Sequence, residues 1–225
     1  MLTITSMSRD QNPTGFEFLD TTLTDHDILR GIVLLGRNVA SYKFALAGAV
    51  IELAAQNIDY ASLEVLADPF ARRLCEHLLT APKQTTSRGS GFLDACSAFN
   101  RGEITLDSLR ATTVRLGFNN VIDAFHVVGR AEVATRFFVD DRKSSRKGIV
   151  LTDQAFGLAT TAYAQSLKEI EARWRLVETA WDLGINTSLI RYDEVTGLFT
   201  DSERRVDVTS ARDALNGYQK GKCFY

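Results

Sequence analysis

The stretch DHDILRGIVLLGRNVASYKFALAGAVIELAAQ, residues 25–56, carries a regular apolar pattern that organises the predicted fold. Thr24 and Asp27 have the spacing of a helix-starting capping box. The apolar residues then recur at alternating steps of four and three, on one face of a helix; they are Ile28, Ile32, Leu35, Val39, Tyr42, Leu46, Ala49 and Leu53. The pattern predicts one long core helix over 25–56. A dimerising coiled coil is the alternative, and the glycines in the stretch disfavour it because glycine weakens helices.

Capping residues, glycines and prolines divide the rest of the chain into shorter predicted elements. Helices are predicted at Ser62–Leu66, Pro69–Leu79, Phe92–Asn100, Leu106–Leu116, Asp153–Gln165 and Ala211–Tyr218. A further helix opens with a capping box at Ser166, carries the stripe Ile170, Trp174, Val177 and Trp181, and closes at Gly184. Strands are predicted at Thr135–Asp140, Gly148–Thr152, Leu189–Tyr192, Leu198–Thr200 and Arg204–Val208.

The expected fold class is mainly α with small antiparallel β elements (α+β), a helical body with a β-decorated C-terminal half. Residues 1–20 are expected to be irregular, and 21–130 to form the helical body. Residues 131–208 supply β-hairpins and helices packed on that body. Residues 209–225 form a short helix and the start of a truncated metal knuckle.

Composition narrows the class of protein. Of 225 residues, 45% are hydrophobic and 24% are charged, as in ordinary globular proteins. A net charge of −2 gives no overall field that would attract nucleic acid or a membrane, so any polyanion site must be local. Cys75, Cys96 and Cys223 lack the paired spacing of a disulfide framework, and the first two are expected to be core residues. We therefore expect a cytoplasmic protein with no membrane partner.

The C-terminal segment LNGYQKGKCFY, residues 215–225, runs from a helix end through glycine turns to Cys223. A glycine turn before cysteine is how a zinc knuckle begins, because it lets two thiolates meet one tetrahedral ion. The second thiolate would fall one position beyond residue 225, so this chain would hold half of such a site.

Four segments resemble bacterial HNH endonucleases. The segment VTSARDALNGYQKGKCFY, residues 208–225, resembles the lead-in to their zinc-stabilised ββα-metal module. RNVASYKFALA (37–47), GFNNVIDAFH (117–126) and EARWRLVETAW (171–181) resemble their N-terminal region. The resemblance implies the recognition, regulatory or assembly region of a DNA-targeting HNH endonuclease of restriction or defence type. The full-length family would bind zinc and a divalent metal ion, with Cys223 as a possible zinc ligand.

The family's catalytic residues have no counterpart in this chain. An HNH site uses a histidine to activate water and a divalent ion to stabilise the phosphate charge. His26, His77 and His126 lie far apart, and none belongs to an Asp-His pair of the family's kind. His26 and His77 are expected at the surface, and His126 is expected to be a satisfied buried histidine or, alternatively, a functional one. The chain is therefore predicted to have no cleavage activity and no cofactor of its own.

The predicted hairpin tip DDRKSSRKG, residues 140–148, is the main candidate nucleic-acid site. Arg142, Lys143, Arg146 and Lys147 crowd into it with two serines, which suits a phosphate backbone. A solvated tip kept soluble by its charges is the alternative. Weaker candidates of the same kind are Lys83, Arg88, Arg37 and Lys43.

Two rival interpretations remain open from the sequence. Asp123, Asp141 and Lys143 match the sparse pattern of a PD-(D/E)xK nuclease, in which two carboxylates hold Mg²⁺ and a lysine orients the attacking water. Ile122 replaces the usual proline before the first aspartate. The other alternative is a protein-interaction module, acting as a homo-oligomer or with a partner protein, that never binds nucleic acid.

Overall fold

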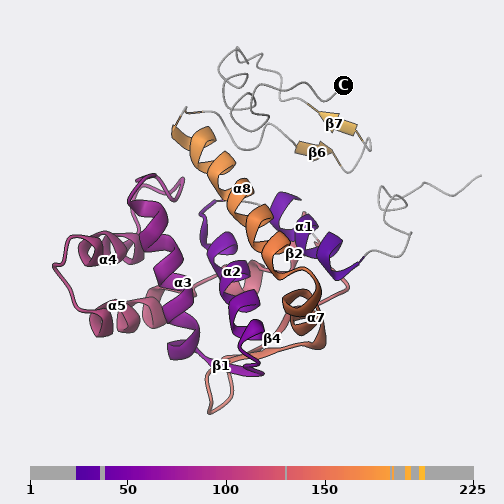
Figure 1. Cartoon of the computed structure of the whole chain (residues 1–225). Coiled ribbons are helices and arrows are strands. Elements are labelled where there is room, and N and C mark those ends of the chain that lie inside the picture. The colour runs from indigo at the N-terminus through magenta and orange to yellow at the C-terminus, as the bar shows by residue number, and fades with distance from the viewer. Residues whose placement is uncertain are drawn as a thin grey trace, which may run out of the picture.

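The structure is a computed structural model that describes residues 24–35, 39–129, 131–182 and 184, together with the strands 191–193 and 198–200. It is mainly helical with small antiparallel strands, as predicted (Figure 1). The helices are α1 (Asp25–Leu35), α2 (Tyr42–Ala55), α3 (Leu63–Leu78), α4 (Gly91–Asn100), α5 (Leu106–Thr112), the π-helical turn Thr113–Gly117, α6 (Val121–Ala124), α7 (Asp153–Thr161) and α8 (Tyr163–Asp182). The strands are β1 (Tyr60–Ser62), β2 (Val127–Val128), β3 (Ala131–Glu132), β4 (Phe138–Asp141), β5 (Gly148–Leu151), β6 (Arg191–Asp193) and β7 (Leu198–Thr200).

The stretch over 25–56 folds as two helices, so the prediction of one long helix is wrong. The capping box at its start is confirmed, because the Asp27 N–H donates to Thr24 Oγ1 and the Thr24 N–H donates to Asp27 Oδ2, both at 3.2 Å. The helix does not continue through 40–41. There the backbone bonds instead to the loop after α3, with Ala40 bridging Thr85 and the Ser41 N–H donating to the Gln84 carbonyl at 3.0 Å.

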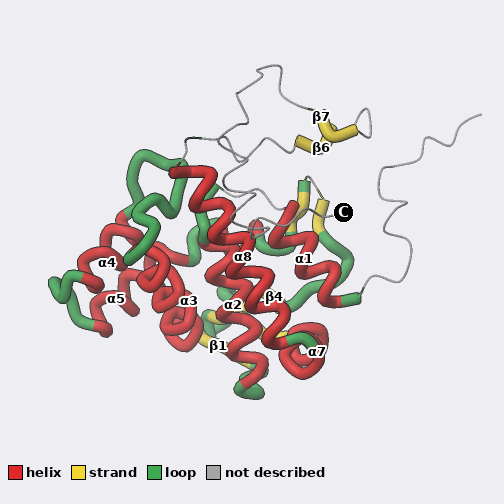
Figure 2. The backbone as a smooth tube through the Cα atoms, turned by 45° about the horizontal axis from the view of Figure 1, so that its top comes forward, coloured by secondary structure: helices red, strands yellow, loops and turns green. Residues whose placement is uncertain are grey.

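Helix α2 is the centre of the core, as predicted. Every residue from Lys43 to Ile51 is buried, so the helix is covered all round rather than along one stripe. Helices α3, α7, α8 and α1 pack around it (Figures 1 and 2). Its many alanines allow these neighbours to approach closely, and no face of α2 is left free for a coiled-coil partner.

Helix α3 corrects a second prediction. The helices expected at Ser62–Leu66 and Pro69–Leu79 are one continuous helix, capped by the Ser62 hydroxyl, which accepts from the Val65 N–H at 3.3 Å. Pro69 is buried inside it and cannot donate to the Val65 carbonyl. Val65 itself is 44% exposed, so this turn of α3 lies at the protein surface.

The following helices match their predicted boundaries closely. Thr105 caps α5, and Gly102 follows α4 with a φ of +73° that suits glycine. Cys75 on α3 and Cys96 on α4 are buried free thiols in the core, as expected.

Strands β1, β5 and β4 form a small antiparallel sheet in that order, and the predicted hairpin β4–β5 is confirmed. Glycine is required at position 148, where β5 pairs with β1. A Cβ at this position would lie 2.2 Å from the Ala61 carbonyl oxygen and 2.6 Å from Tyr60 Oη, so only glycine fits.

The last described helices differ in one boundary from the prediction. Ser166 does not open a helix; it is buried inside α8, which starts at Tyr163 after a break at Ala162. The stripe Ile170, Trp174, Val177 and Trp181 is buried as predicted. Strands β6 and β7 pair antiparallel near their expected positions. The predicted strand at 204–208 and helix at 211–218 lie outside the described residues. Within the described part of the chain, no helix combines the length and apolarity needed to cross a bilayer.

Candidate functional site

The β4–β5 tip, residues 142–147, is shaped by side chains that hold its own backbone. Ser144 Oγ donates to Asp141 Oδ2 at 2.7 Å and accepts from the Arg146 N–H at 3.1 Å. Lys147 has a φ of +51°, and its carbonyl accepts from the Leu63 N–H at 3.1 Å. The tip is therefore joined to the start of α3 and is not an isolated extension.

Arg142 forms ion pairs with two carboxylates of the same chain. Its guanidinium contacts Asp140 of β4 at 2.7 Å and Asp123 of α6 at 2.6 Å. Arg142 holds the pKa of Asp140 below its usual value, and the same carboxylates raise the pKa of Arg142. Because its charge is compensated locally, Arg142 is a poor phosphate ligand, and it serves to tie α6 to the hairpin.

Lys143, Arg146 and Lys147 are the available cations of the tip. All three are exposed, and none forms an ion pair with a carboxylate among the described residues. The Arg146 guanidinium lies 3.5 Å above the centre of the Tyr60 ring, which fixes its position while leaving it solvent-facing. We call Lys143, Arg146 and Lys147 the tip cations.

The two carboxylates of the alternative magnesium site, Asp123 and Asp141, have different partners in the structure. Arg142 bonds both Asp123 and Asp140, and so links Asp123 to the hairpin. Asp141 instead accepts a hydrogen bond from Ser144. Arg142 therefore lies between Asp123 and Asp140, and not between Asp123 and Asp141. Across the residues that the structure describes, no group of three or more His, Cys, Asp or Glu side chains could hold a metal. We derive no metal-dependent step from these residues.

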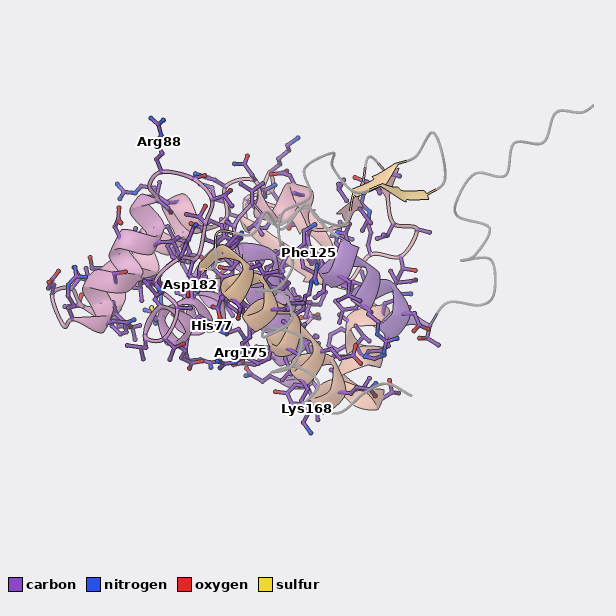
Figure 3. All side chains as sticks on the ribbon, turned by 90° about the horizontal axis from the view of Figure 1, so that it is seen from above. His77, Arg88, Phe125, Lys168, Arg175 and Asp182 are labelled. Atoms are coloured by element: carbon purple, nitrogen blue, oxygen red, sulfur yellow. The ribbon has the colours of Figure 1, made fainter. Side chains whose placement is uncertain are left out.

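The weaker basic candidates lie apart from the tip. Lys83 donates to the Trp181 carbonyl at 3.0 Å, near the end of α8. Arg88 projects away from the ribbon into solvent (Figure 3). Lys43 is 5% exposed, which removes it from any surface that a nucleic acid could contact. Arg37 and Cys223 lie outside the described residues.

Lys43 and His126 are two buried basic residues close to the start of β2. Lys43 Nζ donates to the Val127 carbonyl at 3.2 Å, and burial lowers its pKa to about 8. His126 Nε2 accepts from the Phe137 N–H at 3.0 Å, which requires a neutral ring protonated at Nδ1. Burial, with Arg136 and Lys43 nearby, lowers the pKa of His126 to about 4. His126 is therefore a satisfied core histidine.

His77 is the centre of a buried polar network that the sequence did not reveal; the expectation of a surface histidine is wrong. Its ring stacks on Trp174 with centroids 3.5 Å apart, and it is 7% exposed. Nδ1 lies 2.6 Å from Glu178 Oε1 and Nε2 lies 2.9 Å from Glu171 Oε2. Gln84 joins the network by donating to Glu178 at 2.5 Å and accepting from Trp174 Nε1 at 2.9 Å.

This network ties the loop after α3 to α8. Both ring nitrogens of His77 lie within hydrogen-bond distance of carboxylates, Glu178 and Glu171, on α8. The single sequence signal was the spacing of Glu171, Trp174 and Glu178, which puts them on one face of a helix. Nothing in the sequence indicated that Gln84 and His77 would meet them.

Comparison with known proteins assigns no family. No protein-family model, no curated protein and no solved structure matches the chain.

Proposed function

We propose that this protein is the DNA-contacting recognition region of an HNH-type endonuclease and that the β4–β5 tip binds the phosphate backbone. The observation that carries the proposal is the set of tip cations, three exposed and locally uncompensated charges within five residues. The resemblance at residues 208–225 supplies the HNH assignment. With zinc and a divalent ion, the full-length family would cleave DNA in a module that follows this region.

The tip suits a phosphate backbone for electrostatic reasons. With a formal net charge of −2, the chain as a whole does not attract DNA, so affinity must arise where cations are grouped. Each phosphate that a cation neutralises releases counterions and adds to the binding free energy. Tyr60 holds Arg146 in place, which reduces the side-chain entropy lost on binding.

The chain itself is proposed to bind without cutting, in the cytoplasm. It has no Asp-His pair of the family's kind, and Arg142 engages Asp123, one carboxylate of the alternative metal site. Free thiols at Cys75 and Cys96 suit a reducing compartment.

Charge-neutralising variants test the proposal. Fluorescence anisotropy with a labelled duplex would compare the wild type with Arg146→Gln and with the triple variant Lys143→Gln, Arg146→Gln, Lys147→Gln. Arg115→Gln is the matched control, because Arg115 is also exposed, forms no ion pair among the described residues and lies on the π-helical turn. Thermal unfolding would verify that each variant folds.

We expect the triple variant to lose most DNA affinity and Arg146→Gln to lose about tenfold. Arg115→Gln should bind as the wild type does. Equal losses in Arg115→Gln and Arg146→Gln would mean that only overall charge matters, and the tip would not be the site. Magnesium-dependent cleavage by the purified chain, abolished by Lys143→Ala, would favour the PD-(D/E)xK alternative instead.

A further inference from the structure

Helices α1 and α8 pack against each other and do not form the tip (Figure 1). A groove of about 780 Å³ lies between them. Apolar side chains form most of its walls, including Leu29 and Val33 from α1 and Ile170 and Leu176 from α8. This volume is in the range of pockets that enclose small organic ligands. The groove can therefore take an apolar body.

Arg173 of α8 lines the same groove and carries an uncompensated charge. It donates from Nη2 to the Leu34 carbonyl at 3.1 Å, in the last turn of α1. Its Nε is buried and has no hydrogen-bond partner in the part of the chain that the structure describes. None of the carboxylates in the described ranges forms an ion pair with it, and burial lowers its pKa. A helix-end carbonyl satisfies one of its five N–H groups and does not cancel its charge.

The other arginines of these two helices are paired, which makes Arg173 the exception. Arg30, one helical turn before Leu34 on α1, contacts Glu169 at 2.9 Å and Asp27 at 3.0 Å. Arg175, two residues after Arg173, contacts Glu171 at 2.6 Å. A partly buried arginine without an acid is costly, and a bound anion would offset that cost.

A second unsatisfied group lies on the groove wall. The hydroxyl of Ser166 is buried and has no hydrogen-bond partner among the described residues, although Ser166 lines the groove about two helical turns before Arg173. Buried polar groups are nearly always hydrogen-bonded, so the Ser166 hydroxyl and the Arg173 Nε, about two turns apart on α8, favour a polar ligand in the groove.

We propose that the groove between α1 and α8 binds an amphipathic anion, with an aliphatic chain between the helices and a carboxylate or phosphate head group on Arg173. The guanidinium recognises both head groups through paired N–H donors. This binding site is independent of the tip and of the DNA-binding proposal, and it would give the protein a small-molecule ligand.

Calorimetric titration of the full 225-residue chain tests this site. The probes are decanoate, decyl phosphate and the uncharged decanol, which share one chain and differ in the head group. Arg173→Met removes the charge, and Arg175→Gln is the matched control two residues away. Ala172→Trp fills the groove from an exposed position and so should not disturb the core.

At least one anion should bind about tenfold more tightly than decanol. Arg173→Met should abolish that preference, Arg175→Gln should keep it, and Ala172→Trp should prevent binding of all three probes. The tighter anion identifies the head group. Equal affinity for decanol and both anions, unchanged binding by Ala172→Trp, or no binding by the intact chain would each overturn the proposal.

Discussion

Acidification should destabilise the protein through His126, whose neutral ring is required in the folded state. The folded-state pKa is about 4, against 6.5 for a free histidine. Between these values the unfolded chain binds more protons than the folded one, so stability falls as the pH falls. The contribution is fully present above pH 6.5 and is lost progressively down to pH 4.

The magnitude follows from the pKa difference. At about 1.4 kcal/mol per pKa unit, His126 should cost about 2 kcal/mol of unfolding free energy at pH 5 and about 3 kcal/mol at pH 4. That is a large part of the stability of an ordinary domain. Lys43 contributes to the effect, because its ammonium disfavours a second positive charge beside it.

Urea unfolding of the wild type and of His126→Gln, from about pH 7.5 to about pH 4, would measure this contribution. Glutamine offers Oε1 as an acceptor for the Phe137 N–H and cannot gain a proton in this range. The difference in unfolding free energy between the two proteins should change by about 2 kcal/mol between pH 7.5 and pH 5. A constant difference across that interval would refute the reasoning.

Two further substitutions test the packing around the site. Gly148→Ala should lower the unfolding free energy by about 3 kcal/mol, because the new Cβ would meet the Ala61 carbonyl; urea titration giving under about 1 kcal/mol would contradict the close approach of β1 and β5. Glu178→Leu should cost about 3 kcal/mol, since it leaves buried donors of His77 and Gln84 without their acceptor. A Glu178→Leu protein as stable as the wild type would show that the network is dispensable.

Local signals in the sequence predicted much of the fold, and they failed where packing overrides them. The Thr24–Asp27 capping box, the Thr105 cap and the β4–β5 hairpin depend on residues close in sequence, and all three are confirmed. The break before α2 could not be located, because α2 is apolar on every side and gives no stripe whose end would mark a boundary. Pro69 suggested a helix start, but tertiary burial holds it within α3.

The candidate site could be predicted only as far as it is local. The tip cations are close together in the sequence, so their clustering could be predicted from the sequence alone. The pairing of Arg142 with Asp123 joins residues 19 apart, and His77 meets Glu178 across 101 positions. No short-range pattern encodes such contacts, and they decide which cations stay free and which histidines are buried.

The salt dependence of DNA binding tests the central claim most directly. Each phosphate contact contributes about 0.9 to the slope of log affinity against log salt concentration for duplex DNA. If the tip cations Lys143, Arg146 and Lys147 each neutralise a phosphate, replacing all three by glutamine should reduce the slope by about 2.7. An unchanged slope in the triple variant would contradict the assignment of the β4–β5 tip as the DNA-binding site.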